Sequence, residues 1–176
     1  MSRDLQLLHP VTAQKATLVI NMCKAKGVDI LVYCTLRTLE EQAKLYRQGR
    51  SREVIETKMK NLRNAGYDFL AAIIEAVGPQ KGNRKLTNAA PGESWHNLGF
   101  AFDAVPLIGK EPAWAYEGNE ELWKVYGSVC KYNGLTWGGD WKFIDYPHAQ
   151  EHTESNPLRV YNPEALKRLL SERGLL

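Results

Sequence analysis

The sequence contains few cysteines and no long apolar run. Its three cysteines, Cys23, Cys34 and Cys130, are odd in number and include no C-x-x-C pair, so they do not indicate a disulfide framework. We expect each to be a buried, reduced thiol. No stretch approaches the roughly 18 consecutive apolar residues of a membrane-spanning helix. The first residues place Asp4 early and lack the apolar run of a secretory leader, so we expect synthesis in the cytoplasm without a signal peptide.

The sequence also lacks a strong charge of one sign. It has 23 Lys+Arg against 20 Asp+Glu, a net charge of +3 that identifies no acidic partner. Residues 37–63 hold eight basic and four acidic residues, which is typical of a solvated helix surface. No nucleic-acid-binding motif accompanies them, so we expect no nucleic-acid partner. The length of 176 residues indicates one compact domain over residues 1–176, and we expect a monomer.

Helical and strand patterns are mixed along the chain without a regular βαβ alternation. Helices are predicted over residues 12–26, 38–49, 51–77, 119–134 and from 162 onward, and strands over residues 28–34, 100–105, 141–145 and around 148. Residues 80–92 are predicted to form a loop. This mixture indicates an α+β fold, with a small antiparallel sheet flanked by helices.

Several local signals fix details of these elements. Thr38 and Glu41 form a capping box, and Asn119 is placed to cap the fourth helix. Gly66 is a weak point within residues 51–77. The segment FAFDAV at 100–105 alternates like a half-buried strand, and a tight turn at residues 146–147 is expected to join two short strands.

Two segments dense in Gly and Trp, residues 92–103 and 137–148, hold the candidate metal ligands. A catalytic zinc takes three protein ligands and leaves one position for water. His96, Asp103 and His148 could supply two nitrogens and one oxygen, with Gly99 allowing the chain to turn between the first two.

Two alternatives accompany this ligand set. His148 and His152 would form a competing H-x3-H pair if their segment were helical, although Pro147 and the strand-like residues before it argue against a helix. Asp145 is either a general base beside the metal or a residue that caps the turn at 146–147.

A resemblance adds to this interpretation. The run Ser94-x-His96-x-x-Gly99-x-Ala101-x-Asp103 resembles the S-x-H-x-x-G-x-A-x-D signature of the zinc D-Ala-D-Ala carboxypeptidase family. That family includes vancomycin-resistance carboxypeptidases and the L-alanyl-D-glutamate endopeptidases of phage lysis.

Two further motifs occur in the order that this family has them. Residues 145–148, Asp-Tyr-Pro-His, are similar to its second motif. Residues 37–50 resemble the R-[ST]-x-x-E-Q-x-x-L-Y-x-Q-G-R run of the phage endopeptidase branch. The three motifs span roughly residues 28–150, and their joint presence is far more specific than any one of them.

The resemblance implies a fold and a set of roles. The fold would be that of the Hedgehog and D-Ala-D-Ala-peptidase zinc domains, with one Zn²⁺ per chain held by His96, Asp103 and His148. Asp145 would act as general base and acid, and Arg37 would stabilise the oxyanion. The implied substrate contacts are Ser94, Tyr46, Trp95 and Trp137, although core packing is an equal alternative for the three aromatic residues.

The resemblance also implies a function. We expect a zinc-dependent peptidoglycan peptidase, an endolysin that hydrolyses the L-alanyl–D-glutamate bond of the stem peptide and acts on the cell wall after holin-type release. Alternatives are a D,D-carboxypeptidase or dipeptidase that releases terminal D-Ala, and a catalytically silent zinc-binding module of the same fold. Asp145 in place of the Glu of the dipeptidase branch favours the endopeptidase.

One departure from the family pattern is an insert. Phage members pass quickly from the Q-G-R run to the S-x-H motif, whereas about forty residues intervene here, with a helical insert predicted at about 51–92. The insert is a candidate lid or groove wall, or else a purely structural helical hairpin. No separate cell-wall-binding domain is expected.

Overall fold

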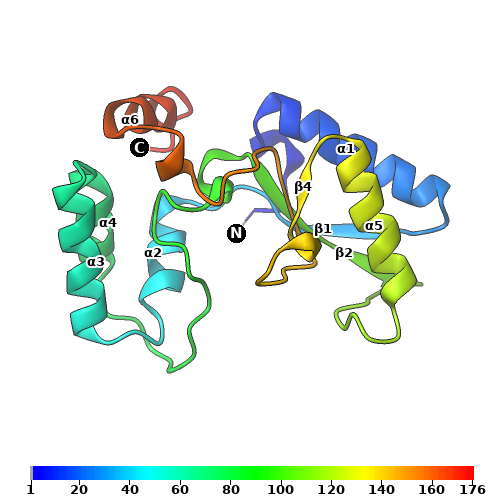
Figure 1. Cartoon of the computed structure of the whole chain (residues 1–176), viewed down its shortest axis with the longest axis horizontal. Coiled ribbons are helices and arrows are strands. Elements are labelled where there is room, and N and C mark those ends of the chain that lie inside the picture. The colour runs from blue at the N-terminus through cyan, green and yellow to red at the C-terminus, as the bar shows by residue number, and fades with distance from the viewer. Residues whose placement is uncertain (1) are drawn as a thin grey trace. The chain divides into compact units, whose positions relative to one another are not determined.

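The computed structural model describes residues 2–176, and the chain divides into two compact units. One unit, called the sheet unit below, consists of the chain up to Leu36 together with Gly99–Thr153. The other, called the helical unit, consists of Arg37–Leu98 together with Glu154–Leu176. Figure 1 shows the helices and strands of both. A single catalytic domain over residues 1–176 stays a prediction.

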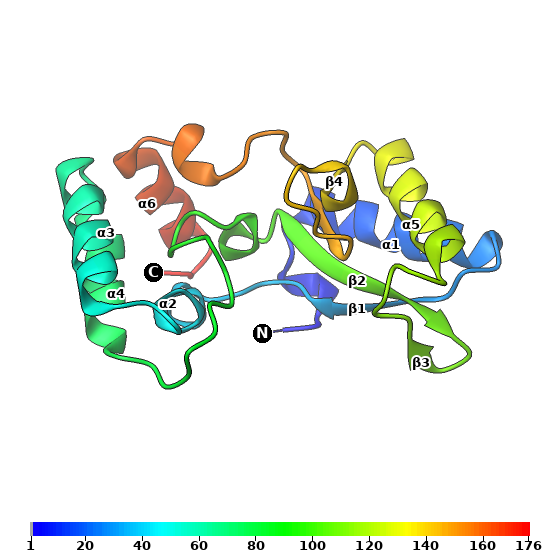
Figure 2. The same ribbon diagram turned by 60° about the horizontal axis from the view of Figure 1, so that its bottom comes forward.

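The sheet unit is an antiparallel sheet with two long helices. Its elements in chain order are η1 (Leu5–Leu7), α1 (Pro10–Ala25), β1 (Ile30–Cys34), β2 (Ala101–Ile108), β3 (Glu111–Pro112), α5 (Glu120–Tyr132), β4 (Thr136–Trp137), η3 (Gly138–Asp140) and β5 (His148–Gln150). The strand order is β1-β2-β5-β4, and β3 pairs with the end of β2. Helices α1 and α5 pack against each other and lie on one side of the sheet (Figure 2). The predicted α+β fold with a small antiparallel sheet is confirmed.

Strand β2 is the centre of this sheet and differs from the prediction in its burial. Residues 101–106 are buried without exception, so the strand is not half-buried. The polar residue that suggested alternation, Asp103, is itself buried. Asp103 is therefore a buried carboxylate, and the alternating pattern of FAFDAV does not indicate that one side of the strand faces solvent.

The segment WKFID is not a strand, which corrects the prediction for residues 141–145. Strand β4 comes earlier, at Thr136–Trp137, and Gly138 and Gly139 then turn the chain into the short helix η3. The chain leaves the sheet there, and Phe143 and Ile144 are 81% and 56% exposed. The turn at residues 146–147 and the strand at His148 are both present, as predicted.

The helical unit contains α2 (Leu39–Arg47), α3 (Arg52–Asn64), α4 (Asp68–Val77), η2 (Trp95–Leu98), η4 (Pro157–Arg159) and α6 (Pro163–Glu172). Helix α4 packs against both α2 and α3. The helical stretch predicted at 51–77 is two helices, because Gly66 adopts a φ of +83° that ends α3 and lets the chain reverse into α4.

Of the two predicted caps, the capping box at α2 is confirmed and the cap by Asn119 at α5 is wrong. At α2 the Glu41 N–H donates to Thr38 Oγ1 over 3.1 Å, and the Thr38 N–H donates to Glu41 Oε2 over 3.0 Å. Asn162 likewise caps α6 through Oδ1. Asn119 precedes α5 but makes no side-chain cap, because its Nδ2 donates instead to the carbonyl of Ala115.

The three cysteines are buried and free of disulfides, as expected. Burial raises the pKa of the Cys23 thiol to about 11 and raises that of Cys130 further. Cys23 and Cys130 therefore stay protonated at neutral pH.

Within residues 2–176, no helix combines the length and the apolar character needed to cross a membrane.

Candidate functional site

Asp103 and His148 face each other within the sheet unit. They are Cα partners on the antiparallel strands β2 and β5, so their side chains share one face of the sheet. His148 Nδ1 lies 3.1 Å from Asp103 Oδ1, and both residues are only 8% exposed. The sheet thus brings two of the three predicted metal ligands together, although 45 residues separate them in the chain.

A third residue, Gln150, fixes the ring of His148. Gln150 Oε1 lies 3.0 Å from His148 Nε2, and Gln150 Nε2 donates to the carbonyl of His152 over 2.6 Å. The second bond orients the amide so that its oxygen faces the ring, and the histidine must then donate from Nε2. Gln150 was not predicted, but its spacing of two from His148 along a strand places both side chains on the same face.

The two contacts of His148 show whether its ring and the Asp103 carboxylate are suited to hold a metal cation. Both ring nitrogens face an oxygen that can only accept, if the Asp103 carboxylate is ionised. A neutral imidazole has one N–H, so it satisfies Gln150 with Nε2–H and leaves the lone pair of Nδ1 facing a carboxylate. An imidazolium, with two N–H donors, satisfies both oxygens, and so does a neutral ring with a cation held between Nδ1 and Oδ1. This donor pair suits Zn²⁺.

The turn that carries Asp145 and His148 is anchored through its main chain. The Asp145 N–H donates to the Gly138 carbonyl over 3.0 Å, and the His148 N–H donates to the Asp145 carbonyl over 3.1 Å. The Tyr146 carbonyl accepts from the Trp137 indole Nε1–H over 2.7 Å. Asp145 itself is exposed, so its side chain lies at the surface of the sheet unit.

The remaining carbonyl of the turn, that of Pro147, accepts two hydrogen bonds. The Ala104 N–H donates over 3.0 Å and the Tyr126 hydroxyl over 2.9 Å. Burial raises the pKa of Tyr126 well above its usual value, so the hydroxyl stays protonated and able to donate. All three carbonyls of residues 145–147 are therefore hydrogen-bonded.

Glycine at position 138 is required for space. A Cβ built there would overlap the carbonyl oxygen of Asp145 and lie 3.2 Å from the Cβ atoms of both Asp145 and His148. The φ of Gly138 is not positive, so backbone conformation alone would permit another residue. The indole of Trp137, which donates a hydrogen bond to the Tyr146 carbonyl of this turn, packs against Gly127 and Gly139. A Cβ at either glycine would overlap the Trp137 ring.

His96 and Arg37 belong to the helical unit and are joined there through their main chains. His96 is buried in η2, and its carbonyl accepts from the Arg37 N–H over 3.1 Å. Asn97 strengthens this link, because its Nδ2 donates to the Arg37 carbonyl over 2.9 Å and its Oδ1 accepts from the Gly92 N–H over 3.0 Å. Asn97 was not predicted, and no motif spacing singled it out.

The Arg37 side chain is held by a buried glutamine. Arg37 Nη1 donates to Gln42 Oε1 over 3.0 Å, and Gln42 Nε2 donates to the Ala89 carbonyl over 2.7 Å. Gln42 is fully buried on α2. The Gln of the 37–50 motif thus supports the Arg37 side chain, and the Glu before it forms the capping box of α2.

The predicted substrate residues are placed as follows. Trp95 is buried and donates from Nε1 to the Glu154 carbonyl over 2.8 Å, and Trp137 is buried in the core of the sheet unit. Tyr46 is buried, with the Arg50 guanidinium 4.0 Å above its ring. Ser94 accepts through its carbonyl from the Asn97 N–H. Contact of these four residues with substrate stays a prediction.

The comparisons with known proteins agree with the motifs. A family model described as D-alanyl-D-alanine carboxypeptidase matches residues 87–151. The peptidoglycan L-alanyl-D-glutamate endopeptidase CwlK of Bacillus subtilis (strain 168) is 32% identical over 150 residues, which cover 81% of this chain and 72% of that protein. The chain belongs to the zinc D-Ala-D-Ala carboxypeptidase family of peptidases. The resemblance drawn from the three motifs is therefore confirmed.

Two further proteins are similar to this chain at lower identity. The L-alanyl-D-glutamate peptidase of Listeria phage A118 is 26% identical over 141 residues, covering 79% of this chain and 36% of the phage protein. Among solved structures, the vancomycin resistance D,D-pentapeptidase VanY in complex with Zn(II) shares 18% identity and a TM-score of 0.47, over 93% of this chain and 83% of that one.

Proposed function

We propose that this protein is a zinc-dependent peptidoglycan peptidase that hydrolyses the L-alanyl–D-glutamate bond of the stem peptide. The observation that carries the proposal is the pairing of Asp103 Oδ1 with His148 Nδ1 at 3.1 Å, in a ring orientation set by Gln150. The named activities of the Bacillus and Listeria phage relatives support the choice of bond.

Asp103 and His148 fit Zn²⁺ by their donor atoms, and His96 is the third ligand in the S-x-H-x-x-G-x-A-x-D motif. We propose one ion per chain. When bound, zinc supplies Lewis-acid activation of water and of the scissile carbonyl. Gln150 contributes by holding the Nε2–H of His148, which keeps Nδ1 as the ligand atom.

The chain's own residues then handle protons and charge. The carboxylate of Asp145 accepts a proton from the attacking water and returns it to the leaving amine, a transfer typically worth about 10²–10⁴-fold in rate. The permanently charged guanidinium of Arg37 stabilises the negative oxygen that develops on the substrate. Ser94 hydrogen-bonds the substrate, and Tyr46, Trp95 and Trp137 are proposed to shape its surroundings.

Release of terminal D-Ala is the second candidate, because the matching family model is described as a D-alanyl-D-alanine carboxypeptidase. Digestion of purified peptidoglycan followed by mass spectrometry separates the two activities. New N-terminal D-glutamate supports the endopeptidase, whereas loss of terminal D-Ala alone refutes it. Zinc-loaded protein that releases neither product would be the silent zinc-binding module. An Asp145→Ala variant is the control for contaminating hydrolases.

We further propose that the cleavage serves cell lysis, as in an endolysin released through a holin-type membrane lesion. The support is the similarity to a phage peptidase. Expression inside bacteria should cause lysis when a membrane-permeabilising protein is co-expressed. Lysis that is equally fast with the Asp145→Ala variant would refute this role.

A further inference from the structure

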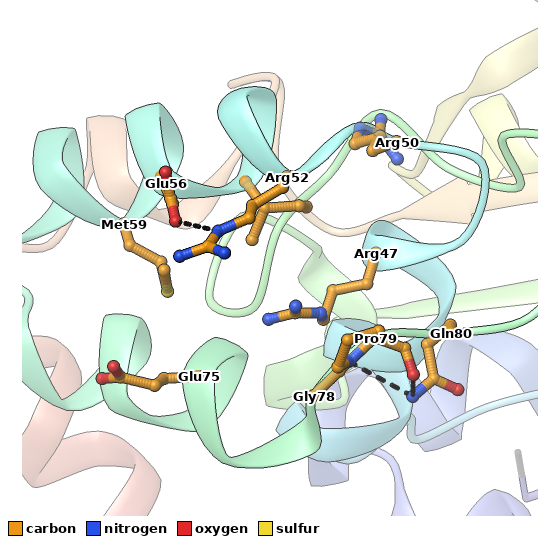
Figure 3. Close-up of a pocket in the computed structure, with 10 residues that line it drawn as sticks. Arg47, Arg50, Arg52, Glu56, Met59, Glu75, Gly78, Pro79 and Gln80 are labelled. Atoms are coloured by element: carbon orange, nitrogen blue, oxygen red, sulfur yellow. Dashed lines mark hydrogen bonds and ion pairs between the residues drawn. The ribbon is translucent and has the colours of Figure 1, made fainter.

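The helical unit contains a cavity of about 330 Å³ that none of the motifs explains. Its walls come from the end of α2, the first half of α3, the end of α4 and residues 78–80 (Figure 3). The volume is at the lower end of the range for small-molecule sites. Most of this wall belongs to the insert that separates the Q-G-R run from the S-x-H motif.

Arg47 lines this cavity and carries a donor that is unsatisfied. Its Nη1 donates to the Ile74 carbonyl at the end of α4 over 2.7 Å. Its Nε is buried and has no hydrogen-bond partner among residues 2–176. Figure 3 shows the Arg47 guanidinium pointing into the space between α3 and α4. A buried donor without a partner is costly, and together Nε–H and Nη2–H form the edge that binds a carboxylate or phosphate in bidentate fashion.

The charges around the cavity leave it net positive. Its two carboxylates already have cationic partners, Glu56 with Arg52 over 2.5 Å and Glu75 with Arg63 over 2.7 Å. Figure 3 shows the carboxylate of Glu75 directed away from Arg47.

Arg50, a further cation of the wall, is bound only by neutral groups. Its Nη2 donates to the Thr87 carbonyl over 2.6 Å, its Nη1 donates to the Tyr46 carbonyl, and its guanidinium stacks on the Tyr46 ring. Within the described part of the chain, neither Arg47 nor Arg50 forms an ion pair with a carboxylate.

We propose that this cavity binds an oxyanion, a carboxylate or phosphate carried on an apolar stem, with Arg47 as its bidentate donor. The anion would satisfy Arg47 Nε and offset positive charge of the Arg47 and Arg50 guanidinium groups. Ile55 and Met59 line the same cavity and offer apolar surface to the stem. No residue that lines the cavity is assigned to peptide hydrolysis, although Arg50 stacks on the ring of Tyr46, and the proposal does not depend on the proposed function.

The test uses the full chain and two probes, N-acetyl-D-glutamate for carboxylates and glycerol 3-phosphate for phosphates. The Nε–Hε resonance of Arg47 in a ¹⁵N-edited spectrum reports directly on the proposed donor. We expect a saturable shift with at least one probe, and the probe that saturates identifies the source of the anion. Absence of a saturable shift with both probes up to 20 mM would overturn the proposal.

Variants then distinguish specific binding at Arg47 from nonspecific electrostatic attraction of anions. Probe binding, measured by calorimetry, should weaken at least tenfold in Arg47→Met and in Arg47→Lys, because Lys keeps the charge but lacks the bidentate edge. Arg159→Met removes an exposed charge outside the cavity and should change affinity less than twofold. Equal weakening by Arg47→Met and Arg159→Met would refute the site. If Arg47→Met does not fold, Arg47→Lys decides alone.

Discussion

The substitution Gly138→Ala tests whether the turn at residues 145–148 places catalytic groups. The added Cβ would overlap the Asp145 carbonyl oxygen and press on the Cβ atoms of Asp145 and His148. Since the overlapping atom belongs to the backbone, no side chain can rotate away, and the turn must shift by on the order of an ångström. Misplacement by about 1 Å costs roughly 10²-fold in catalysis, which is about 2.7 kcal/mol of transition-state stabilisation.

The assay is kcat/KM on purified peptidoglycan, with the melting temperature measured in parallel. The control is Gly109→Ala, where a Cβ meets nothing within 4 Å but the φ of +63° strains the backbone. We expect the control to lose some stability and keep its activity. If Gly138→Ala folds and retains more than half of the wild-type kcat/KM, the turn does not place catalytic groups.

Three other substitutions test the supports of the site. Trp137→Phe removes the indole N–H and should lower the free energy of unfolding by about 1–3 kcal/mol in urea titrations, whereas Trp114→Phe, at a residue 59% exposed, should change it little. Gln150→Leu should weaken zinc binding about 10–100-fold in chelator competition, and unchanged affinity would contradict the role given to Gln150. Arg37→Ala should keep its metal and lose about 10²–10³-fold in kcat, and an unchanged kcat would remove Arg37 from the mechanism.

Features set by neighbours in the chain could be predicted from the sequence. The capping box of Thr38 and Glu41 and the break at Gly66 each depend on a few adjacent residues, and the structure has both. The sequence pattern predicts a strand at WKFID, which the structure does not have. The preceding Gly138 instead packs against Asp145, a contact that local pattern cannot reveal.

Some features of the candidate site could likewise be predicted from the sequence, and others depend on the folded structure. Pairing of Asp103 with His148 depends on the register of β2 against β5, which the packing of the whole sheet sets. The family motif identified both residues without that knowledge. The competing pair of His148 and His152 fails because β5 ends at Gln150 and no helix follows there. Gln150 and Asn97 have no motif of their own, and only their hydrogen bonds reveal them.

The most direct test of the central claim is the zinc content of the purified protein, measured by mass spectrometry of the metal beside peptidoglycan hydrolysis. We predict one zinc per chain in the wild type, almost none in His148→Ala, and a full complement without activity in Asp145→Ala. A His148→Ala protein that is folded, filled with zinc and active would show that the Asp103–His148 pair is not the metal site of this peptidase.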